Sequence, residues 1–195
     1  METGLSIEEL RIMAANLRKE GLNSQQIADE LSLSQDTIAW LSAGTSGEEK
    51  PRDVHIGWRT IGVKPQRIAA IGAIMADVVA EECGDGIDTV IGVSINGVIF
   101  AHEVASQLGC EVANHRNVDG APGKGSLSNK YGQVSGKRIV IVDDVLSTGV
   151  TMSRTIESMR ESGAEVALCM VLVNKTPRNE IDEVPLRGII RAAVV

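Results

Sequence analysis

The sequence predicts an α/β domain in which helices flank a parallel sheet, preceded by a small all-α domain. From Arg67 onward, apolar strand-like runs alternate with segments of helical period, which is the pattern of a parallel sheet covered by helices. Residues 1–43 instead contain short helical periods with no strand signal between them. The stretch 44–66 carries glycine, proline and charge without period. The predicted organisation is therefore a helical domain at 1–43, a linker at 44–66 and an α/β domain at 67–195.

The first predicted helix of the small domain has apolar residues at helical spacing, namely Leu10, Met13, Ala14 and Leu17. Ser6 followed by Glu9 is typical of a capping box, and Gly21 ends the helix. A second helix is expected after Asn23 or Ser24. After a tight turn at 32–34, a third helix directs Ile38 and Leu41 inward.

The predicted elements of the α/β domain follow from the same periodicities. The expected strands cover 88–94, 110–114, 138–142 and 165–173, and the expected helices cover 68–79, 98–108 and 151–162. A glycine-rich loop should extend to Gly136, and the segment 174–195 should contain a last strand.

Composition limits the classes of protein to which the chain can belong. Hydrophobic residues make up 43% of the 195 residues, enough for a sizeable core. No apolar run approaches the ~20 residues of a membrane span, and the first residues lack the pattern of a secretory signal. The three cysteines are scattered, which fits a reducing cytoplasm, and a net charge of -7 disfavours nonspecific coating of nucleic acid. We therefore expect a cytoplasmic protein with no membrane partner.

The stretch VIVDDVLSTGVT, residues 140–151, places Asp143 and Asp144 at the end of an expected strand. Ligands of open α/β sheets bind beyond the carboxyl ends of the strands. The following loop offers hydroxyl groups, backbone N–H groups and Gly149, and the next helix directs its positive N-terminal end at the same place. Such an arrangement suits a sugar phosphate whose hydroxyl groups bind the carboxylates while its phosphate binds the helix end.

This stretch resembles the 5-phosphoribosyl-1-pyrophosphate (PRPP) motif of type I phosphoribosyltransferases, and the resemblance extends over roughly 67–195. It implies the type I phosphoribosyltransferase fold, with Asp143 and Asp144 on the ribose hydroxyls. The residues implied for the 5-phosphate are Ser147, Thr148, Gly149, Val150 and Thr151. An earlier stretch, IGVSINGVIFAHEVA, resembles the pyrophosphate loop of the family, which Ser94, Ile95, Asn96 and Gly97 would form. Mg²⁺ would accompany the pyrophosphate without a direct protein ligand.

The predicted loop after Asn114 decides between an enzyme and a sensor. Its candidate catalytic cations are Arg116, Lys124 and Lys130, with His115 at its edge. The orotate enzymes that the domain resembles have a denser set of lysine, histidine and acidic residues on this loop. The enzymes acting on 6-oxopurines have a carboxylate at the position of Ser147. The sequence therefore favours a ligand sensor and leaves phosphoribosyl transfer open.

Residues 23–44 resemble a helix-turn-helix, whose third helix would lie in the major groove of DNA. The candidate DNA-binding residues are Gln35, Asp36, Thr37 and Trp40. Residues 1–43 contain seven acidic and three basic residues, a net charge of -4, whereas 50–67 has a net charge of +4. Because phosphate contacts dominate DNA affinity, an acidic unit should bind weakly alone. A helical dimerisation or lid module is the alternative for this segment.

The whole chain, linker included, resembles the archaeal orotate phosphoribosyltransferase-like transcriptional regulators, which are known for control of central sugar catabolism. Bacterial purine repressors combine similar parts. The resemblance implies a dimeric DNA-binding regulator of sugar catabolic or nucleotide genes that senses PRPP or a related phosphorylated metabolite. The alternative is an active orotate or purine phosphoribosyltransferase that transfers phosphoribose from PRPP to a nucleobase.

Overall fold

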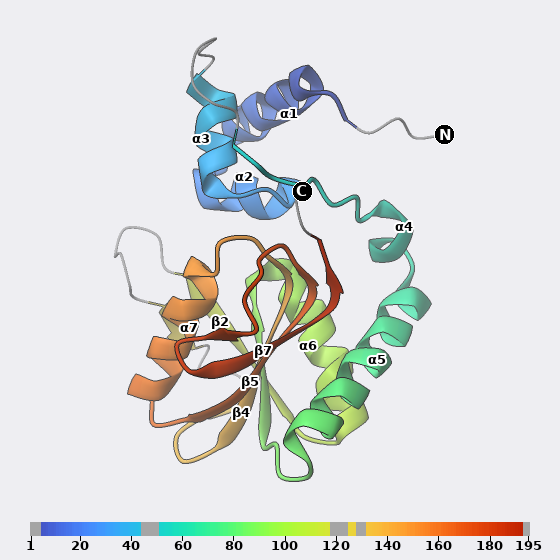
Figure 1. The fold of residues 1–195 in the computed structure, drawn as a ribbon, viewed down its shortest axis with the longest axis vertical. Coiled ribbons are helices and arrows are strands. Elements are labelled where there is room, and N and C mark those ends of the chain that lie inside the picture. The colour runs from blue at the N-terminus through green and yellow to red at the C-terminus, as the bar shows by residue number, and fades with distance from the viewer. Residues whose placement is uncertain (1–4, 44–50, 118–124, 128–131, 193–195) are drawn as a thin grey trace. The chain divides into compact units, whose positions relative to one another are not determined.

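A computed structural model of the chain describes residues 5–43, 51–117, 125–127 and 132–192 (Figure 1). The chain divides into two compact units, one ending at Gly57 and the other beginning at Trp58. This division lies inside the stretch 44–66 that was predicted as a linker. Within the described ranges, no helix combines the length and the hydropathy that a membrane crossing requires.

The first unit is a helical bundle. Its helices are α1 (Ile7–Lys19), α2 (Ser24–Leu31) and α3 (Gln35–Ala43). Ser6 and Glu9 form the predicted capping box, in which each side chain accepts from the other residue's backbone N–H. Ala14, Ile27 and Ile38 lie in the shared core. Met13 shares the helical spacing of Leu10, Ala14 and Leu17, but its side chain is exposed.

Asp53 connects the segment after α3 back to the start of that helix. Its Oδ2 accepts a hydrogen bond of 2.7 Å from the backbone N–H of Ser34 and one of 2.9 Å from the hydroxyl of Thr37. A carboxylate is favoured at a helix N-terminus, where backbone N–H groups lack partners within the helix. Asp53 thus fixes the turn between α2 and α3 from outside the three helices.

We expect Asp53→Ala to destabilise the helical unit by about 1–2 kcal/mol, because it removes two hydrogen bonds to a charged acceptor at a helix start. Urea denaturation of the full chain, followed by circular dichroism, would measure this change. Arg52→Ala alters the neighbouring exposed residue and serves as the control. Equal denaturation midpoints for Asp53→Ala and the native chain would contradict a capping role.

The second unit begins with two helices, α4 (Arg59–Gly62) and α5 (Pro65–Cys83). The other helices are α6 (Ser94–Leu108) and α7 (Val150–Glu161). The strands are β1 (Thr89–Val93), β2 (Glu111–Asn117), β3 (Gly125–Leu127), β4 (Arg138–Leu146), β5 (Glu165–Asn174), β6 (Glu180–Ile181) and β7 (Val184–Arg191).

The described strands form one sheet in the order β3-β2-β1-β4-β5-β7-β6. Strands β2, β1, β4, β5 and β7 are parallel to one another, whereas β3 pairs antiparallel with β2 and β6 pairs antiparallel with β7 at the two edges. The predicted parallel sheet is therefore confirmed in its centre, while the short antiparallel edge strands make the whole sheet mixed.

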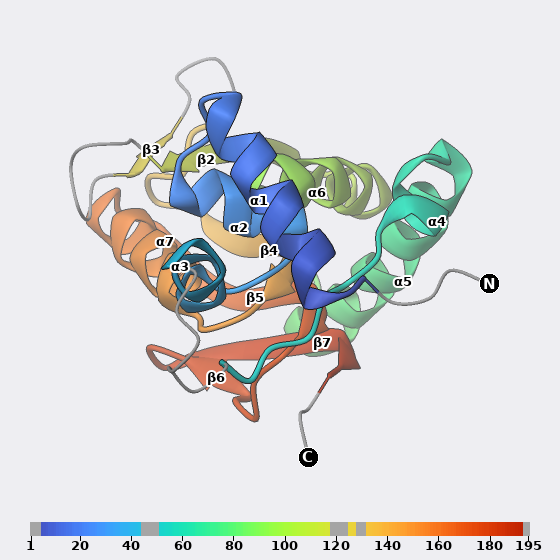
Figure 2. The same ribbon diagram turned by 90° about the horizontal axis from the view of Figure 1, so that it is seen from above.

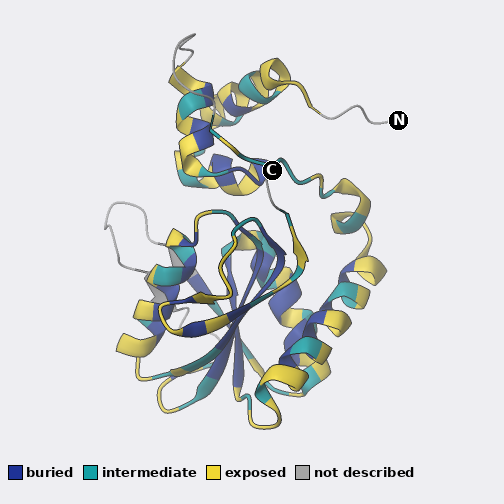
Figure 3. Cartoon of the chain, viewed as in Figure 1, coloured by how far each residue is buried: buried dark blue, intermediate teal, exposed yellow. Residues whose placement is uncertain are grey.

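Helices cover both faces of this sheet. Figure 1 and Figure 2 show α7 on one side, and α5 and α6 on the other. Ile141, Cys169 and Ile156 belong to the core between the sheet and α7. Figure 3 shows the central strands as the most deeply buried part of this unit. Such a rigid aliphatic centre holds the carboxyl ends of β1 and β4 side by side.

Candidate functional site

Asp143 and Asp144 lie within β4, which continues to Leu146. The prediction that the strand ends before them was wrong. Both residues are buried, with 8% and 7% of their surface exposed. The parallel register pairs Gly92 with Val142, so the residues that follow β1 lie beside the carboxylates. An acid pair inside a buried strand is costly unless hydrogen bonds or a ligand compensate it.

Ser94 and Asn96 supply hydrogen bonds to this pair. The Ser94 hydroxyl donates to Asp143 Oδ1 over 2.9 Å, and the backbone N–H of Asp144 donates to the same oxygen over 2.9 Å. The Asn96 side chain hydrogen-bonds the carboxyl group of Asp144. The structure therefore joins the two motifs that the sequence predicted separately.

Burial and the neighbouring charge of Asp144 raise the pKa of Asp143 well above its usual range. Burial also raises the pKa of Asp144, although hydrogen bonds from Asp143 and from backbone N–H groups oppose that effect. Two such carboxyl groups titrate as a pair, and the first proton is held more tightly than by an isolated aspartate. The pair is suited to accept hydrogen bonds from the hydroxyl groups of a ligand.

Residues 94–97 form the first turn of α6 rather than a loop before it. Ser94 has a positive φ of 61°, which is uncommon for a residue other than glycine. Gly97 allows this turn to approach β4, since a Cβ atom at that position would lie 2.9 Å from both Asp143 Cα and Val142 O. The close approach brings the Ser94 hydroxyl into reach of Asp143.

The predicted phosphate loop connects β4 to α7. Ser147 and Thr148 lie between these elements, and Gly149 is the N-cap of α7 with a φ of 87°. Val150 and Thr151, which were predicted with the loop, form the first turn of α7. The backbone N–H of Val150 donates to the Thr148 hydroxyl over a long 3.4 Å. Backbone N–H groups at the start of a helix of this length suit a phosphate group.

Arg178 is a neighbour of this loop that the sequence motifs did not reveal. Its guanidinium lies 3.4 Å from where a Cβ atom of Gly149 would be. Hydrogen bonds to its backbone fix its position: its carbonyl accepts from Asn174 and Arg191, and its N–H donates to Thr176. A cation therefore lies next to the phosphate loop although it follows a different strand.

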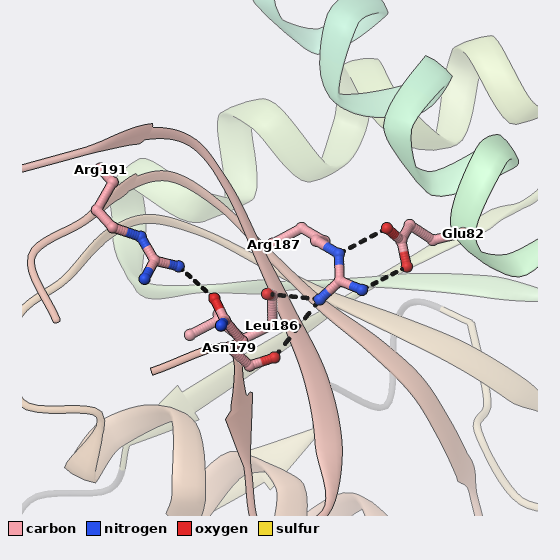
Figure 4. A network of polar contacts seen from close by, with 5 residues as sticks. All are labelled: Glu82, Asn179, Leu186, Arg187 and Arg191. Carbon is pink, nitrogen blue, oxygen red and sulfur yellow. Dashed lines mark hydrogen bonds and ion pairs between the residues drawn. The ribbon is translucent and has the colours of Figure 1, made fainter. Parts of the chain in front are cut away.

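The residue after Arg178 is held by two further arginines (Figure 4). Arg191 hydrogen-bonds the Asn179 side chain, and Arg187 donates to the Asn179 backbone carbonyl. Arg187 also forms a two-bond ion pair with Glu82 of α5, with distances of 2.6 and 2.8 Å. These contacts tie the segment that carries Arg178 to β7 and α5.

His115 was predicted at the edge of the loop after Asn114, but it lies within β2, which continues to Asn117, and it is buried. Its Nδ1 is 3.3 Å from the Thr155 hydroxyl, which donates to the Thr151 carbonyl in α7. Burial lowers the pKa of this imidazole. Of the candidate catalytic cations, Arg116 lies in β2 with its side chain outside the described part, and Lys124 and Lys130 lie outside the described residues.

The helical unit contains the predicted DNA-contacting residues on α3. Gln35 and Asp36 are exposed, and the Gln35 side chain hydrogen-bonds Gln25 of α2. Thr37 was wrongly placed on the outer surface, because it is 7% exposed and its hydroxyl donates to Asp53. Trp40 is half-buried against the core, with the Arg11 guanidinium 5.2 Å from its ring centre. Of the four predicted residues, only Gln35 and Asp36 therefore have exposed side chains.

Comparison with known families identifies the second unit. Residues 57–192 match the model of the family described as Phosphoribosyl transferase domain. Solved structures share the fold at low identity. The orotate phosphoribosyltransferase of Aeropyrum pernix is 22% identical with a TM-score of 0.57, covering 75% of this chain and 83% of that one. The adenine phosphoribosyltransferase of Thermoanaerobacter pseudethanolicus is 18% identical with a TM-score of 0.59, covering 74% and 91%.

Curated relatives match the chain along nearly its whole length, the helical unit included. The Transcriptional regulator GfcR of Thermoplasma acidophilum is 39% identical and is aligned over 97% of this chain and 98% of its own. The Transcriptional regulator GfcR 2 of Methanosarcina barkeri is 38% identical over 95% and 96%. This chain therefore belongs to the phosphoribosyl transferase domain family, together with these archaeal transcriptional regulators.

Proposed function

We propose that the protein is a cytoplasmic transcriptional regulator whose second unit binds a phosphorylated metabolite and whose helical unit binds DNA. The observation that carries this proposal is that one chain contains both features. It holds a buried Asp143–Asp144 pair that is hydrogen-bonded by Ser94, and it matches a transcriptional regulator along both of its units. The relatives' name supports the regulatory role, and the buried carboxyl pair supports a ligand rich in hydroxyl groups.

The ligand would bind by dividing its groups between two places at the carboxyl end of the sheet. A vicinal diol would donate to Asp143 and Asp144, replacing the protein donors that now satisfy them. A phosphate would accept hydrogen bonds at the start of α7 and pair with Arg178. Such a ligand can control DNA binding only if it has different affinities for the DNA-competent and DNA-incompetent arrangements of the protein.

Mg²⁺ would enter this site with a pyrophosphate-bearing ligand such as PRPP. The described part of the chain contains no group of three or more metal-ligating side chains. The ligand's own phosphates and water would therefore provide most of the coordination, in keeping with the preference of Mg²⁺ for phosphate and water oxygens.

On the DNA side, we propose that Gln35 and Asp36 at the start of α3 face the base edges, since glutamine and aspartate side chains can hydrogen-bond them. Arg52, which is exposed and belongs to the same unit, would supply a contact to the phosphates. A homodimer would present two such surfaces to the half-sites of a palindromic operator.

The test is selection of duplex DNA from a random pool by the full-length protein, with and without PRPP and Mg²⁺ or ribose 5-phosphate. We expect enrichment of a palindromic sequence that changes when a ligand is added. Gln35→Ala should weaken the selected binding by about tenfold or more, as expected for the loss of a base contact. Glu20→Ala, at the exposed end of α1, is the control.

Failure to enrich any sequence under all conditions would contradict the DNA-binding role. Sustained pyrophosphate release from PRPP in the presence of orotate or adenine, without DNA selection, would instead establish a phosphoribosyltransferase.

A further inference from the structure

The chain that joins the two units is anchored in the first unit by a side chain. The boundary between the units lies within residues 53–58, which we call the connecting segment. Both oxygens of the Asp53 carboxylate are used at its start. Oδ2 accepts from the Ser34 N–H and from the Thr37 hydroxyl, and Oδ1 accepts from the Val54 N–H over 2.8 Å. The connecting segment is therefore fixed to the start of α3.

The other end of the connecting segment packs on α6 in the second unit. The ring centres of Trp58 and Phe100 are 6.2 Å apart and the rings are tilted by 48°, an arrangement in which aromatic rings attract each other. Phe100 is 5% exposed and follows the first turn of α6, residues 94–97. That turn binds the carboxyl pair through Ser94. Because a helix moves largely as a rigid element, a shift of its first turn also moves the ring on which Trp58 packs.

The connecting segment is short between these two anchors. Five Cα–Cα steps separate Asp53 from Trp58, so the segment spans at most ~18 Å. Residues 54–56 are half-buried, whereas Gly57 is exposed and no atom of the described residues lies within 4 Å of a Cβ atom added there. The segment thus has little slack, and a displacement of Trp58 is passed on toward Asp53.

The contacts of Asp53 surround the residues proposed to face DNA. Ser34 and Thr37, which donate to its carboxylate, lie directly before and after Gln35 and Asp36 in the sequence. When these hydrogen bonds are made, they hold the first turn of α3. When they are broken, that turn loses its acceptor. A cap that is either made or broken is a two-state element, which energetic coupling between two sites requires.

We propose that the connecting segment transmits ligand binding at the carboxyl pair to the start of α3. A ligand that takes over the acceptor oxygen of Asp143 releases Ser94, and the first turn of α6 is then free to move. Phe100 carries this movement to Trp58. The segment in turn displaces Asp53 from α3, which changes the surface offered to DNA. This inference rests on the proposed function and adds the route by which its two units communicate.

Hydrogen exchange of the full-length protein, without ligand or DNA, is the first test. Trp58→Ala removes the ring that packs on Phe100, so the amides of residues 34–37 should exchange about fivefold faster, as expected when about one hydrogen bond is lost. Asp53→Ala gives the rate of the uncapped helix. Ile99→Ala shortens an exposed side chain next to Phe100 and should leave the rates unchanged. Retained protection of β4 amides would show that the second unit of Trp58→Ala is folded.

An insertion tests transmission while keeping every contact. Gly-Ser-Gly-Ser placed after Gly57 lengthens the connecting segment, and calorimetry should find native affinity for ribose 5-phosphate and for PRPP with Mg²⁺. In the native protein, saturation with the tighter of these two compounds should accelerate exchange at residues 34–37 by about fivefold. The insertion should abolish this response. The same insertion after Asp85, at a bend between α5 and β1, is the control and should preserve it.

Three results would overturn the inference, and they differ in what else they affect. Native exchange rates at residues 34–37 in Trp58→Ala would show that the second unit does not hold the cap. A bound ligand that leaves these rates unchanged in the native protein, or that still accelerates them in the variant with the insertion after Gly57, would exclude transmission by this segment. In both cases ligand binding stands. If calorimetry detects no binding of either compound, the proposed sensing function itself fails, and the inference fails with it.

Discussion

Asp143→Asn should stabilise the second unit while abolishing ligand binding. Burial raises the pKa of Asp143, so ionisation of this group at neutral pH costs free energy of folding. An asparagine oxygen can still accept from Ser94 and from the Asp144 N–H, and its amide can donate to Asp144. We expect a gain of about 1–3 kcal/mol at pH 7, the usual cost of burying a polar group that its hydrogen bonds do not fully compensate. Differential scanning calorimetry would measure this gain.

The pH dependence of this gain follows from its cause. The unfolded chain releases the Asp143 proton near pH 4, at about the ordinary aspartate pKa, whereas the folded chain retains it to higher pH. The native protein therefore loses stability as pH rises above about 4 until the folded group has also ionised. The advantage of Asp143→Asn should be absent below that pH and grow above it.

Isothermal titration with ribose 5-phosphate would test the second half of this prediction, the loss of ligand binding. The native chain should bind the compound and Asp143→Asn should not. Asp85→Asn changes an exposed aspartate at a bend and should alter neither stability nor binding. A variant that is less stable than the native chain at pH 7 would contradict the proposed cost of the buried carboxyl group.

Local sequence patterns predicted the order of the elements and the centre of the sheet, but they placed the end of β4 four residues too early. Charged residues are rarely buried, so an acid pair after an apolar run is normally taken as the end of the strand. Here Ser94 and Asn96 come from a distant part of the chain to hydrogen-bond the pair, which allows the strand to continue. The spacing of apolar residues along β4 cannot reveal these hydrogen bonds, because the donors lie elsewhere in the sequence.

The residues that sequence patterns missed or misplaced depend on long-range contacts. Arg178 lies near Gly149 because β5 and the turn after it fold back to the phosphate loop. Thr37 was predicted to face DNA from a helix start, yet it is buried and its hydroxyl donates to Asp53, 16 residues later in the chain. The order of strand, acidic pair, loop and helix could be read from the local sequence, since β4 and α7 follow one another along the chain. The residues that contact these motifs come from distant parts of the chain, so they depend on the tertiary fold.

Gly97→Ala should be among the most damaging single-methyl additions in the second unit. A Cβ atom there would lie 2.8 Å from Asp143 Oδ1 and 2.9 Å from both Asp143 Cα and Val142 O. Two of these contacts are to backbone atoms of the central strand β4, which cannot move aside as a flexible side chain would. Overpacking costs about 1–3 kcal/mol, and we expect a value near the upper end. The thermal midpoint should fall by ~6–10 °C.

Ligand binding provides a second measurement on this variant, because relief of the clash requires the first turn of α6 to move away from β4. That movement lengthens the hydrogen bond between Ser94 and Asp143, so the affinity for ribose 5-phosphate should fall together with the stability. Gly62→Ala is the matched control, since no atom lies within 4 Å of a Cβ added there. Equal thermal midpoints for the two alanine variants would show that α6 and β4 tolerate a wider spacing. The close approach of Gly97 to Asp143 would then not be what assembles the site.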